Sequence, residues 1–320
     1  MPDATLYFHT ACFDGLVSAA LAWEFLENQG WRFHDLIPVA YNLRESWLGP
    51  LTKPAAVVDF LYHPDAEFWA DHHTTTFLTP AAQQDYETRR GDHFLVFDQA
   101  AGSCATLLLN RLRARIPDPD RFAEAILWAE KIDTAHYDSV EEAIWGTSPA
   151  SIIRLTLASD PDPGYQRLLV TELRSGGLER ISHLPPIQDR FNNVHRRISQ
   201  GLSHASRSIR LHRKIAVLDV ALEGDEIISR YAPYHFFPQA SYSIAIVRSQ
   251  SSITITAMRN PWIEFRSVPI GKVLEPFGGG GHLRVGSVIV PKEKARLTGT
   301  IVDRLLSEMQ SHSSAESVIA

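Results

Sequence analysis

Acidic and imidazole side chains follow short apolar runs at several places in the first half of the chain. Asp71, His72 and His73 end the run EFWADHH, and Asp59 ends the run AAVVD. Two adjacent imidazoles beside a carboxylate suit a metal or phosphate site, although a solvated strand end carries the same residue types. A lone Asp after a strand is equally typical of a turn or cap.

Two further segments repeat the pattern. His9 ends the β-branched and aromatic run that starts at Thr5, and Asp14-Gly15 opens the helix-like segment after it. Asp133 follows an apolar helical face, where a cap region is the ordinary interpretation. Three strand ends thus each offer a potential ligand. Carboxylates and imidazoles together suit manganese- or magnesium-like cations.

The elements that would position these residues alternate between strands and helices. Short apolar runs predict buried parallel strands over residues 5–9, 36–40, 55–60, 68–71 and 94–97. Helical spacing predicts helices over residues 13–28, 103–115, 119–137, 148–159 and 164–175. This order indicates an α/β domain over residues 1–160, with a parallel sheet and helices on both faces. The carboxyl edge of such a sheet is where open α/β folds bind ligands.

The second half of the chain has a different pattern of predicted elements. Residues 186–208 are helical but have few apolar positions, so residues 161–208 are predicted to form a helical connector. Strand candidates follow at 214–222, 226–232, 242–249 and 252–260, with a helix-like segment at 268–277 and then the run GGGGH. A smaller α+β domain is therefore predicted over residues 209–315.

Composition restricts the classes of function. A formal net charge of −6 disfavours binding of long duplex nucleic acid, which requires a basic face. Cys12 and Cys104 form no disulfide or zinc-knuckle pattern. No run approaches the roughly 18 apolar residues that cross a bilayer, and the first residues lack a basic leader pattern. We expect a cytoplasmic protein with no membrane partner.

The ordered motifs resemble the DHH phosphoesterase superfamily with its C-terminal DHH-associated domain. The series is His9, Asp14-Gly15 with Ser18, Val57-Val58-Asp59, Asp71-His72-His73, Asp133, and Gly278, Gly279, Gly280 and Gly281 with His282. The resemblance covers both predicted domains. That superfamily includes nano-RNases, phosphoadenosine-phosphate phosphatases, single-strand exonucleases and cyclic dinucleotide phosphodiesterases.

The resemblance implies a two-metal site. His9, Asp14, Asp59, His72 and Asp133 correspond to its ligands, with Asp59 as the bridge. Manganese is the expected ion, two per chain, with magnesium, zinc or iron as alternatives. Asp71 and His73 correspond to catalytic residues, and His73 would act as an acid or as a donor to the charge on the phosphate.

One residue departs from the usual pattern. The first motif normally has a second Asp three residues after its His, whereas this chain has Cys12 in HTACFDG. A subset of the superfamily resembles this H-x-x-C-x-D-G form. Cys12 is either a soft ligand that favours zinc or iron, or a small unligated residue beside a weaker first site.

The second domain is expected to hold another part of the substrate, in a cleft with the first. Four glycines with His282 can present backbone N–H groups to an anion. Arg259 corresponds to the arginine that accompanies this run in the family, and Arg266 or Arg284 are alternatives.

The expected function is hydrolysis of small nucleotides or short single-stranded oligonucleotides. Two alternatives stay open: a nucleotide-binding or sensing protein with a degenerate first metal site, and a polyphosphate or pyrophosphate hydrolase. The candidates for base stacking are Tyr41, Phe77, Trp262 and Phe265. A homodimer is compatible with the sequence.

Overall fold

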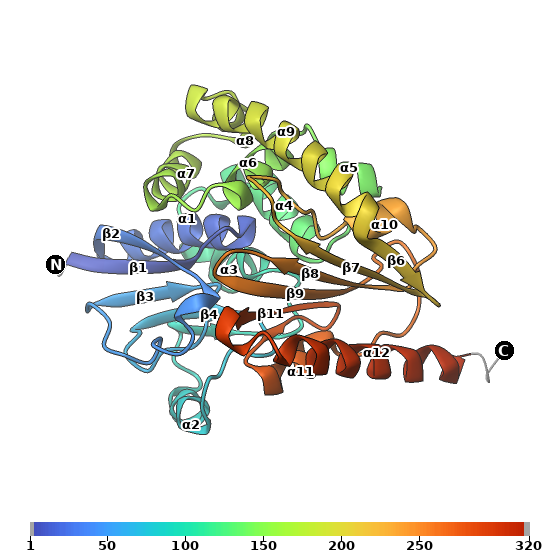
Figure 1. The fold of residues 1–320 in the computed structure, drawn as a ribbon. Helices are drawn as coiled ribbons and strands as arrows, with labels where there is room; N and C mark the ends of the chain where they lie inside the picture. The colour runs from blue at the N-terminus through green and yellow to red at the C-terminus, as the bar shows by residue number, and fades with distance from the viewer. Residues whose placement is uncertain (1–2, 317–320) are drawn as a thin grey trace. The chain divides into compact units, whose positions relative to one another are not determined.

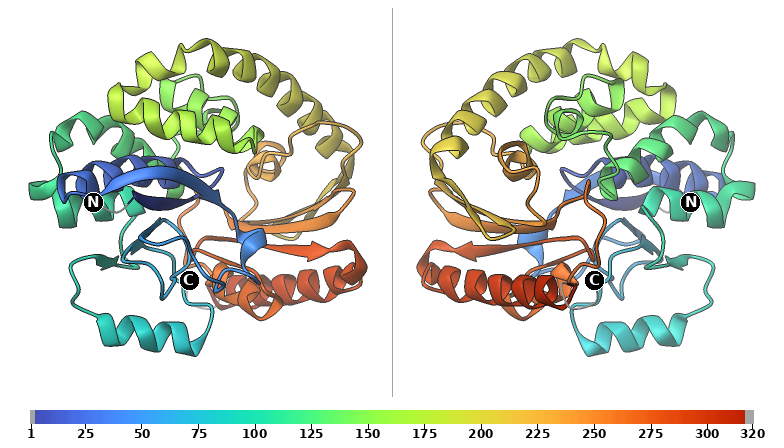
Figure 2. Two further views of the ribbon diagram at one scale, coloured as in Figure 1. Left: turned by 90° about the vertical axis from the view of Figure 1, so that its left-hand side faces the viewer. Right: turned by 90° about the vertical axis from the view of Figure 1, so that its right-hand side faces the viewer.

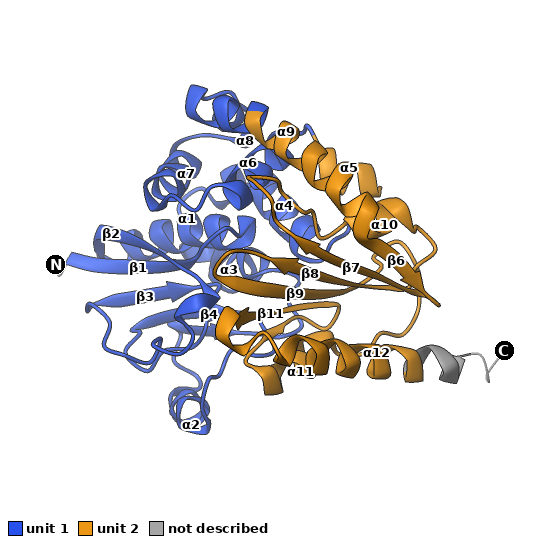
Figure 3. Cartoon of the chain, viewed as in Figure 1, with its two compact units in different colours: residues 1–136, 147–192 blue, residues 137–146, 193–320 orange. Residues whose placement is uncertain are grey.

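The computed structural model describes residues 3–316, with side chains up to residue 311, and the chain divides into two compact units. Unit 1 comprises residues 1–136 and 147–192, and unit 2 comprises residues 137–146 and 193–320 (Figure 3). The chain therefore passes between the units after residues 136, 146 and 192. None of the helices within residues 3–316 has the length and apolarity to cross a membrane.

Unit 1 is built on a five-stranded parallel sheet in the order β2-β1-β3-β4-β5 (Figure 1). The strands are β1 (Asp3–His9), β2 (Arg32–Val39), β3 (Ala55–Val58), β4 (Phe68–Asp71) and β5 (Leu95–Phe97). Every residue of β3 and β4 is buried, which explains their unbroken apolar runs. Since β2 and β3 flank β1 on opposite sides, the strand order reverses at β1 and β3.

Helices cover both faces of this sheet, as predicted. The helices α1 (Phe13–Asn28), α3 (Cys104–Leu112) and α4 (Ala123–Asp133) pack together, and α7 (Pro163–Ser175) packs on α1. The helix α2 (Pro80–Arg89) lies on the opposite side of the sheet from α1 (Figure 2). Its Ala82 and Tyr86 pack against Val57 and Trp69 of the sheet.

Capping residues define where several of these helices begin. The Ser103 side chain accepts a hydrogen bond from the N–H of Thr106 at the start of α3. Asp162 caps α7, whose first residue is Pro163. Unit 1 also contains the 3₁₀ turn η1 (Tyr41–Leu43) and the helices α6 (Pro149–Ser159) and α8 (Leu178–Ser182).

Unit 2 is built on a six-stranded mixed sheet in the order β10-β11-β9-β8-β7-β6. The strands are β6 (Ile209–His212), β7 (Ile215–Ala221), β8 (Tyr242–Arg248), β9 (Ser252–Arg259), β10 (Gly280–Gly281) and β11 (Val285–Pro291). The pair β7 and β8 is parallel, and the other pairs are antiparallel. An α+β arrangement on a small sheet is thereby confirmed.

The core of unit 2 lies between this sheet and two helices, α11 (Ile270–Leu274) and α12 (Leu297–Glu316). Ile270 and Leu274 of α11 and Leu305 of α12 are buried against Ile244 and Ile255. The helix α10 (Ala232–Phe236) packs on β7 and β8, and unit 2 also includes α5 (Val140–Trp145).

Several elements differ from the predictions. Residues 226–232, predicted as a strand, form no strand and lead into α10. The elements α2, β6, β11 and α12 were not predicted. Of the predicted connector over residues 161–208, α7 and α8 pack within unit 1, while α9 (Pro185–Ser208) runs across the boundary between the units. The boundaries predicted at residues 160 and 208 stay predictions.

Candidate metal centre

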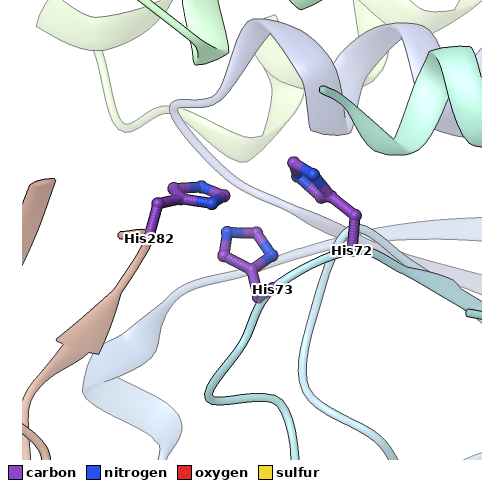
Figure 4. Close-up of side chains that lie close together, drawn as sticks. All are labelled: His72, His73 and His282. Carbon is purple, nitrogen blue, oxygen red and sulfur yellow. The ribbon is translucent and has the colours of Figure 1, made fainter. Parts of the chain in front are cut away.

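The carboxyl edge of the unit 1 sheet gathers the ionisable residues that the motifs singled out. His9 ends β1, Asp59 directly follows β3, and Asp71 ends β4. His72 and His73 project from the chain that leaves β4 (Figure 4). Asp14 comes from the first turn of α1, and Asp133 is the last residue of α4. These residues therefore meet beside the point where the strand order reverses.

The backbone between β1 and α1 is compact and requires special conformations. A Cβ atom at Gly15 would lie 2.3 Å from the carbonyl oxygen of His9, so only glycine lets the helix start this close to the strand. Ala11 and Asp59 both adopt φ 54°, in the left-handed region. Left-handed non-glycine residues cost free energy, which surrounding contacts must offset, and they cluster at functional sites.

Backbone donors at the start of α3 hold the Asp14 carboxylate. Its two oxygens accept hydrogen bonds from the N–H groups of Cys104 at 2.6 Å and Ala105 at 2.8 Å. The hydroxyl of Ser18 donates a third, at 3.2 Å. A helix N-terminus favours an anion. Even so, burial raises the pKa of Asp14, while nearby His72 acts in the opposite direction.

The ring of His72 points one nitrogen at three carboxylates. Its Nδ1–H donates to the carbonyl oxygen of Ala101 at 3.1 Å, because a carbonyl can only accept. Its Nε2 lies 3.2 Å from Asp133 Oδ2, and the two other carboxylates lie at 3.5 Å for Asp14 Oδ2 and 3.6 Å for Asp59 Oδ1. Although burial lowers the pKa of His72, these carboxylates raise it well above its usual value. A positive charge located between the imidazole nitrogen and the three carboxylates would therefore be stabilised.

Asp59 lies at the centre of the cluster and directs its two oxygens to different partners. Oδ2 lies 3.2 Å from His9 Nδ1, whereas Oδ1 lies 3.6 Å from His72 Nε2 and 3.8 Å from His73 Nδ1. The side chain is fully buried, and Oδ1 accepts no hydrogen bond from any residue that the structure describes. Burial, reinforced by Asp14, raises the pKa of Asp59 well above its usual value.

These observations fit divalent cations. A fully buried carboxylate with an unsatisfied oxygen is costly unless a cation or proton compensates it. Three groups of ligand atoms, each mutually within 4.8 Å, occur in unit 1: His9, Cys12 and Asp59; Asp14, His72 and Asp133; and Asp59, Asp71 and His73. Burial, with the neighbouring His73 adding to it, lowers the pKa of His9 to about 3. His9 is therefore neutral near pH 7, the form that binds metals.

Asp71 and His73 form a second arrangement within the cluster. His73 Nδ1–H donates to Asp71 Oδ1 at 2.7 Å, and the hydroxyl of Thr76 donates to the other oxygen of Asp71. Burial acts to raise the pKa of Asp71, but its interaction with His73 leaves that pKa below its usual value. Asp71 is therefore an anion that fixes the orientation of the His73 ring.

In unit 2, Arg259 is buried although it carries a charge. Only 3% of its side chain is exposed; Nη2 donates to the carbonyl oxygen of Ile263 at 2.8 Å, and Nε finds no acceptor among the described residues. The guanidinium also stacks on the ring of Phe265. The alternative arginines, Arg266 and Arg284, are exposed.

The glycine run packs closely against its own unit. Cβ atoms at Gly279 and Gly281 would lie 2.6 Å and 2.5 Å from carbonyl oxygens of β11, and Gly271 of α11 approaches the backbone of Gly281 equally closely. Gly278, at φ 79°, has open space around its missing Cβ. Close backbone packing therefore explains Gly279 and Gly281. His282, the third side chain in Figure 4, belongs to unit 2 and follows the run.

The candidate stacking residues occupy different surroundings. Tyr41 contacts the edge of the His9 ring at 5.1 Å between centroids and so borders the metal cluster. Phe77 packs among Tyr62, Trp69 and Tyr86 beneath the sheet. Trp262 donates its indole N–H to the carbonyl of Tyr137, and Phe265 packs on Tyr242. Only Tyr41 lies at the cluster in unit 1.

Solved structures resemble this chain, although no family model and no curated protein matches it. Among solved structures, PggH, a pGpG-specific phosphodiesterase from Vibrio cholerae, aligns with a TM-score of 0.66 and 17% identity over 96% of this chain and 100% of that chain. The DHH domain of a member of the s1p family of ribosomal proteins aligns with a TM-score of 0.55 and 13% identity over 96% and 86%. The chain has the DHH fold.

A third relative extends the comparison. RecJ in complex with Mn²⁺, from Thermus thermophilus, aligns with a TM-score of 0.55 and 14% identity over 94% of this chain and 51% of that chain. This chain thus spans about half the length of RecJ. These alignments confirm the fold that the motifs predicted, and each covers at least 94% of this chain.

Several residues that position the site were not predicted. Thr76 holds Asp71, the carbonyl of Ala101 holds His72, and the N–H of Ala105 holds Asp14. Gln166 of α7 accepts a hydrogen bond from the hydroxyl of Thr10, in the loop between His9 and Cys12. Backbone donors leave no signature in residue types, and Gln166 belongs to a helix distant in sequence.

Proposed function

We propose that the protein is a metal-dependent phosphoesterase that hydrolyses small nucleotides or short oligonucleotides. The observation that carries the proposal is the fully buried Asp59, which directs one oxygen to His9 and the other to His72 and His73. A carboxylate in this position suits a bridge between two cations. The DHH fold, shared over the full length of PggH, supports the same reaction class.

Two neighbouring positions would hold the ions. His9 and Asp59 belong to the first, and Asp14, His72 and Asp133 belong to the second, with Asp59 shared. When bound, such ions lower the pKa of a coordinated water and stabilise charge on phosphate oxygens. Manganese is our expected ion, since carboxylates and imidazoles together suit it.

The chain's own residues would orient the substrate and move a proton. Asp71, held by Thr76, fixes His73 through Nδ1. The Nε2 atom of His73 lies on the opposite side of the ring, from which it would donate a proton or a hydrogen bond to the phosphate. Because Asp71 stays ionised, it also stabilises a protonated His73.

Unit 2 would bind another part of the substrate. The buried guanidinium of Arg259 keeps an unsatisfied Nε, and a phosphate suits such a donor. The open side of Gly278, together with His282, would contribute further donors. A net charge of −6 agrees with short substrates rather than long duplexes.

The direct test is an assay of the full chain with Mn²⁺. We expect release of mononucleotides from pGpG and other linear dinucleotides, with no cleavage of a long duplex. The variant Asp59→Asn should be inactive while remaining folded by circular dichroism. The exposed Asp303 of α12 offers a matched control, Asp303→Asn. Absence of hydrolysis with every divalent metal would refute the proposal.

The assay also separates the alternative functions. Calorimetric binding of a dinucleotide without turnover would identify a sensing protein with a degenerate first metal site, the alternative that Cys12 raises. Phosphate release from polyphosphate or pyrophosphate, without nucleotide cleavage, would identify a polyphosphate hydrolase.

The two cysteines form no disulfide pattern in the sequence, which supports a cytoplasmic location.

A further inference from the structure

Cys12 lies where the first metal position would be. It is the residue before α1, between His9 at the end of β1 and Asp14 in the first helical turn. Its sulfur lies within 4.8 Å of ligand atoms of both His9 and Asp59, and its side chain is partly exposed. The second cysteine, Cys104, is fully buried and donates its S–H to the carbonyl of Ala70.

The burial of Asp59 also favours a cation near Cys12. Asp59, the carboxylate beside Cys12, is fully buried, and its Oδ1 accepts no hydrogen bond within the described chain. A thiol is a weak donor and does not compensate such a charge. The other oxygen, Oδ2, lies 3.2 Å from His9 Nδ1, so a cation held by His9 and Cys12 would lie next to the same buried carboxylate.

The donor atoms of the two positions differ in chemistry. The group of His9, Cys12 and Asp59 combines one imidazole nitrogen, one sulfur and one carboxylate oxygen. The group of Asp14, His72 and Asp133 combines one imidazole nitrogen with two carboxylate oxygens. Thiolates select softer ions such as zinc, whereas carboxylates suit manganese or magnesium.

We propose that Cys12 is a metal ligand and that the two positions therefore prefer different ions, a zinc-like ion beside Cys12 and a manganese-like ion beside Asp133. This inference rests on the metal centre of the proposed function. Coordination replaces the thiol proton by the metal, and the proton passes to solvent. No change of oxidation state is involved.

Cobalt substitution tests the proposal without relying on activity. The full chain is stripped of metal with a chelator, loaded with Co²⁺ and examined by absorption spectroscopy. We expect a near-ultraviolet thiolate-to-cobalt charge-transfer band in the wild type. The matched control is Cys104→Ala, which removes the other thiol and should keep the band. The variants Cys12→Ser and Cys12→Asp should both lose it.

Two further measurements use the same proteins. In the metal-free wild type one thiol, the partly exposed Cys12, should react with a thiol reagent, and bound Zn²⁺ should protect it. Competition between Zn²⁺ and Mn²⁺, followed by elemental analysis, should show Cys12→Asp shifted towards manganese by at least about tenfold relative to the wild type.

The cobalt spectra distinguish ligation by Cys12 from the proposed hydrolysis. A wild type that binds two Co²⁺ ions without the band, or a Cys12→Ser protein that keeps it, would overturn ligation by Cys12 whether or not hydrolysis occurs. A band in the wild type without hydrolysis of any substrate would support Cys12 ligation and contradict the phosphoesterase. Both serine and aspartate variants are included so that failure of one to fold leaves the test intact.

Discussion

Asp59 combines three properties that ordinary folding disfavours. It is fully buried, it adopts a left-handed φ of 54°, and one of its oxygens lacks a hydrogen bond from any described residue. Each property costs stability in the metal-free protein. Their occurrence in one residue indicates that the site is organised for a bound cation rather than for stability of the chain alone.

Replacing Asp59 by Asn should separate folding from metal binding. Asn tolerates the left-handed conformation and replaces a buried ionisable carboxyl by a neutral amide, so the metal-free variant should be at least as stable as the metal-free wild type. The wild type should gain about 2.7 kcal/mol per site at a free metal concentration of about 100 times Kd, whereas the variant should lose most of this gain. Thermal unfolding with chelator and with Mn²⁺ measures both. A metal-free variant markedly less stable than the wild type would contradict the argument.

The cluster also predicts how the stability of the metal-free protein depends on pH. The pKa values of His72 and Asp59 are raised in the folded state, so above pH 6.5, the usual pKa of histidine, the native state retains protons that the unfolded state has lost. Stability from these groups is therefore lost as the pH rises through the folded-state pKa values. The pKa of His9 is lowered to about 3, so His9 acts in the opposite direction, but only up to roughly one pH unit above 6.5, where the unfolded histidine has also lost its proton.

Urea unfolding should accordingly give a lower midpoint at about pH 8.5 than at pH 6.5 in chelator. Bound metal should reduce the difference, because the ion replaces the protons. A metal-free midpoint that rises with pH over this range would show that the assigned directions are wrong.

At the scale of elements, residue patterns predicted the parts that carry strong periodic signals. The fully buried strands β3 and β4 are short apolar runs, and α1 is a long apolar helix, so each was recognised. The strand β11 was missed although its buried positions alternate, because Gly286 and Pro291 interrupt the pattern. Residues 226–232 are apolar enough for a strand, yet Glu226 instead accepts hydrogen bonds from Glu223 and Gly224 in a turn.

Some residues of the site could be predicted from the sequence, and others could not. The motif residues at strand ends converge because parallel strands bring their carboxyl ends to one edge, which a sequence can indicate. The residues that hold them could not be predicted in this way. The N-terminus of α3 reaches Asp14 from far along the chain, and Gln166 reaches Thr10 from α7. Such contacts depend on the packing of helices, not on local residue types.

Gln166 offers a test of this long-range support. The variant Gln166→Leu leaves the Thr10 hydroxyl without its acceptor, so unfolding should become easier by about 1–3 kcal/mol and metal affinity should fall by about 10- to 100-fold. Gln166→Glu restores an acceptor and should recover most of the affinity, measured by isothermal titration with Mn²⁺. Gln83→Leu, on the exposed face of α2, is the control. Unchanged affinity in Gln166→Leu would exclude a positioning role.

At the scale of the whole molecule, the proposed function assigns a different role to each unit. His9, Asp14, Asp59, His72 and Asp133 belong to unit 1, and the buried Arg259 belongs to unit 2. Changes in one unit should therefore alter one kinetic parameter and leave the other unit's binding intact.

Replacing Arg259 by Met should raise KM for a dinucleotide by about 10- to 100-fold, because a charge-assisted hydrogen bond to phosphate contributes about 1.5–3 kcal/mol. Metal content per chain should not change. Arg248→Met on β8, a partly exposed arginine that pairs with Asp219, is the matched control, and Arg259→Lys guards against a folding defect. A loss of bound metal in Arg259→Met, or an unchanged KM, would contradict this division.

The chain leaves unit 1 after residue 136, close in sequence to the last carboxylate of the cluster. Asp133 ends α4 only a few residues before Tyr137, and unit 2 anchors Tyr137 through the indole N–H of Trp262 and the ring of Tyr231. The last carboxylate of the cluster is thus tethered by a few peptide bonds to the unit that would grip the substrate. Among the carboxylates of the cluster, Asp133 is thus the one nearest in sequence to unit 2, whereas Asp59 and Asp71 lie at the ends of strands of the unit 1 sheet.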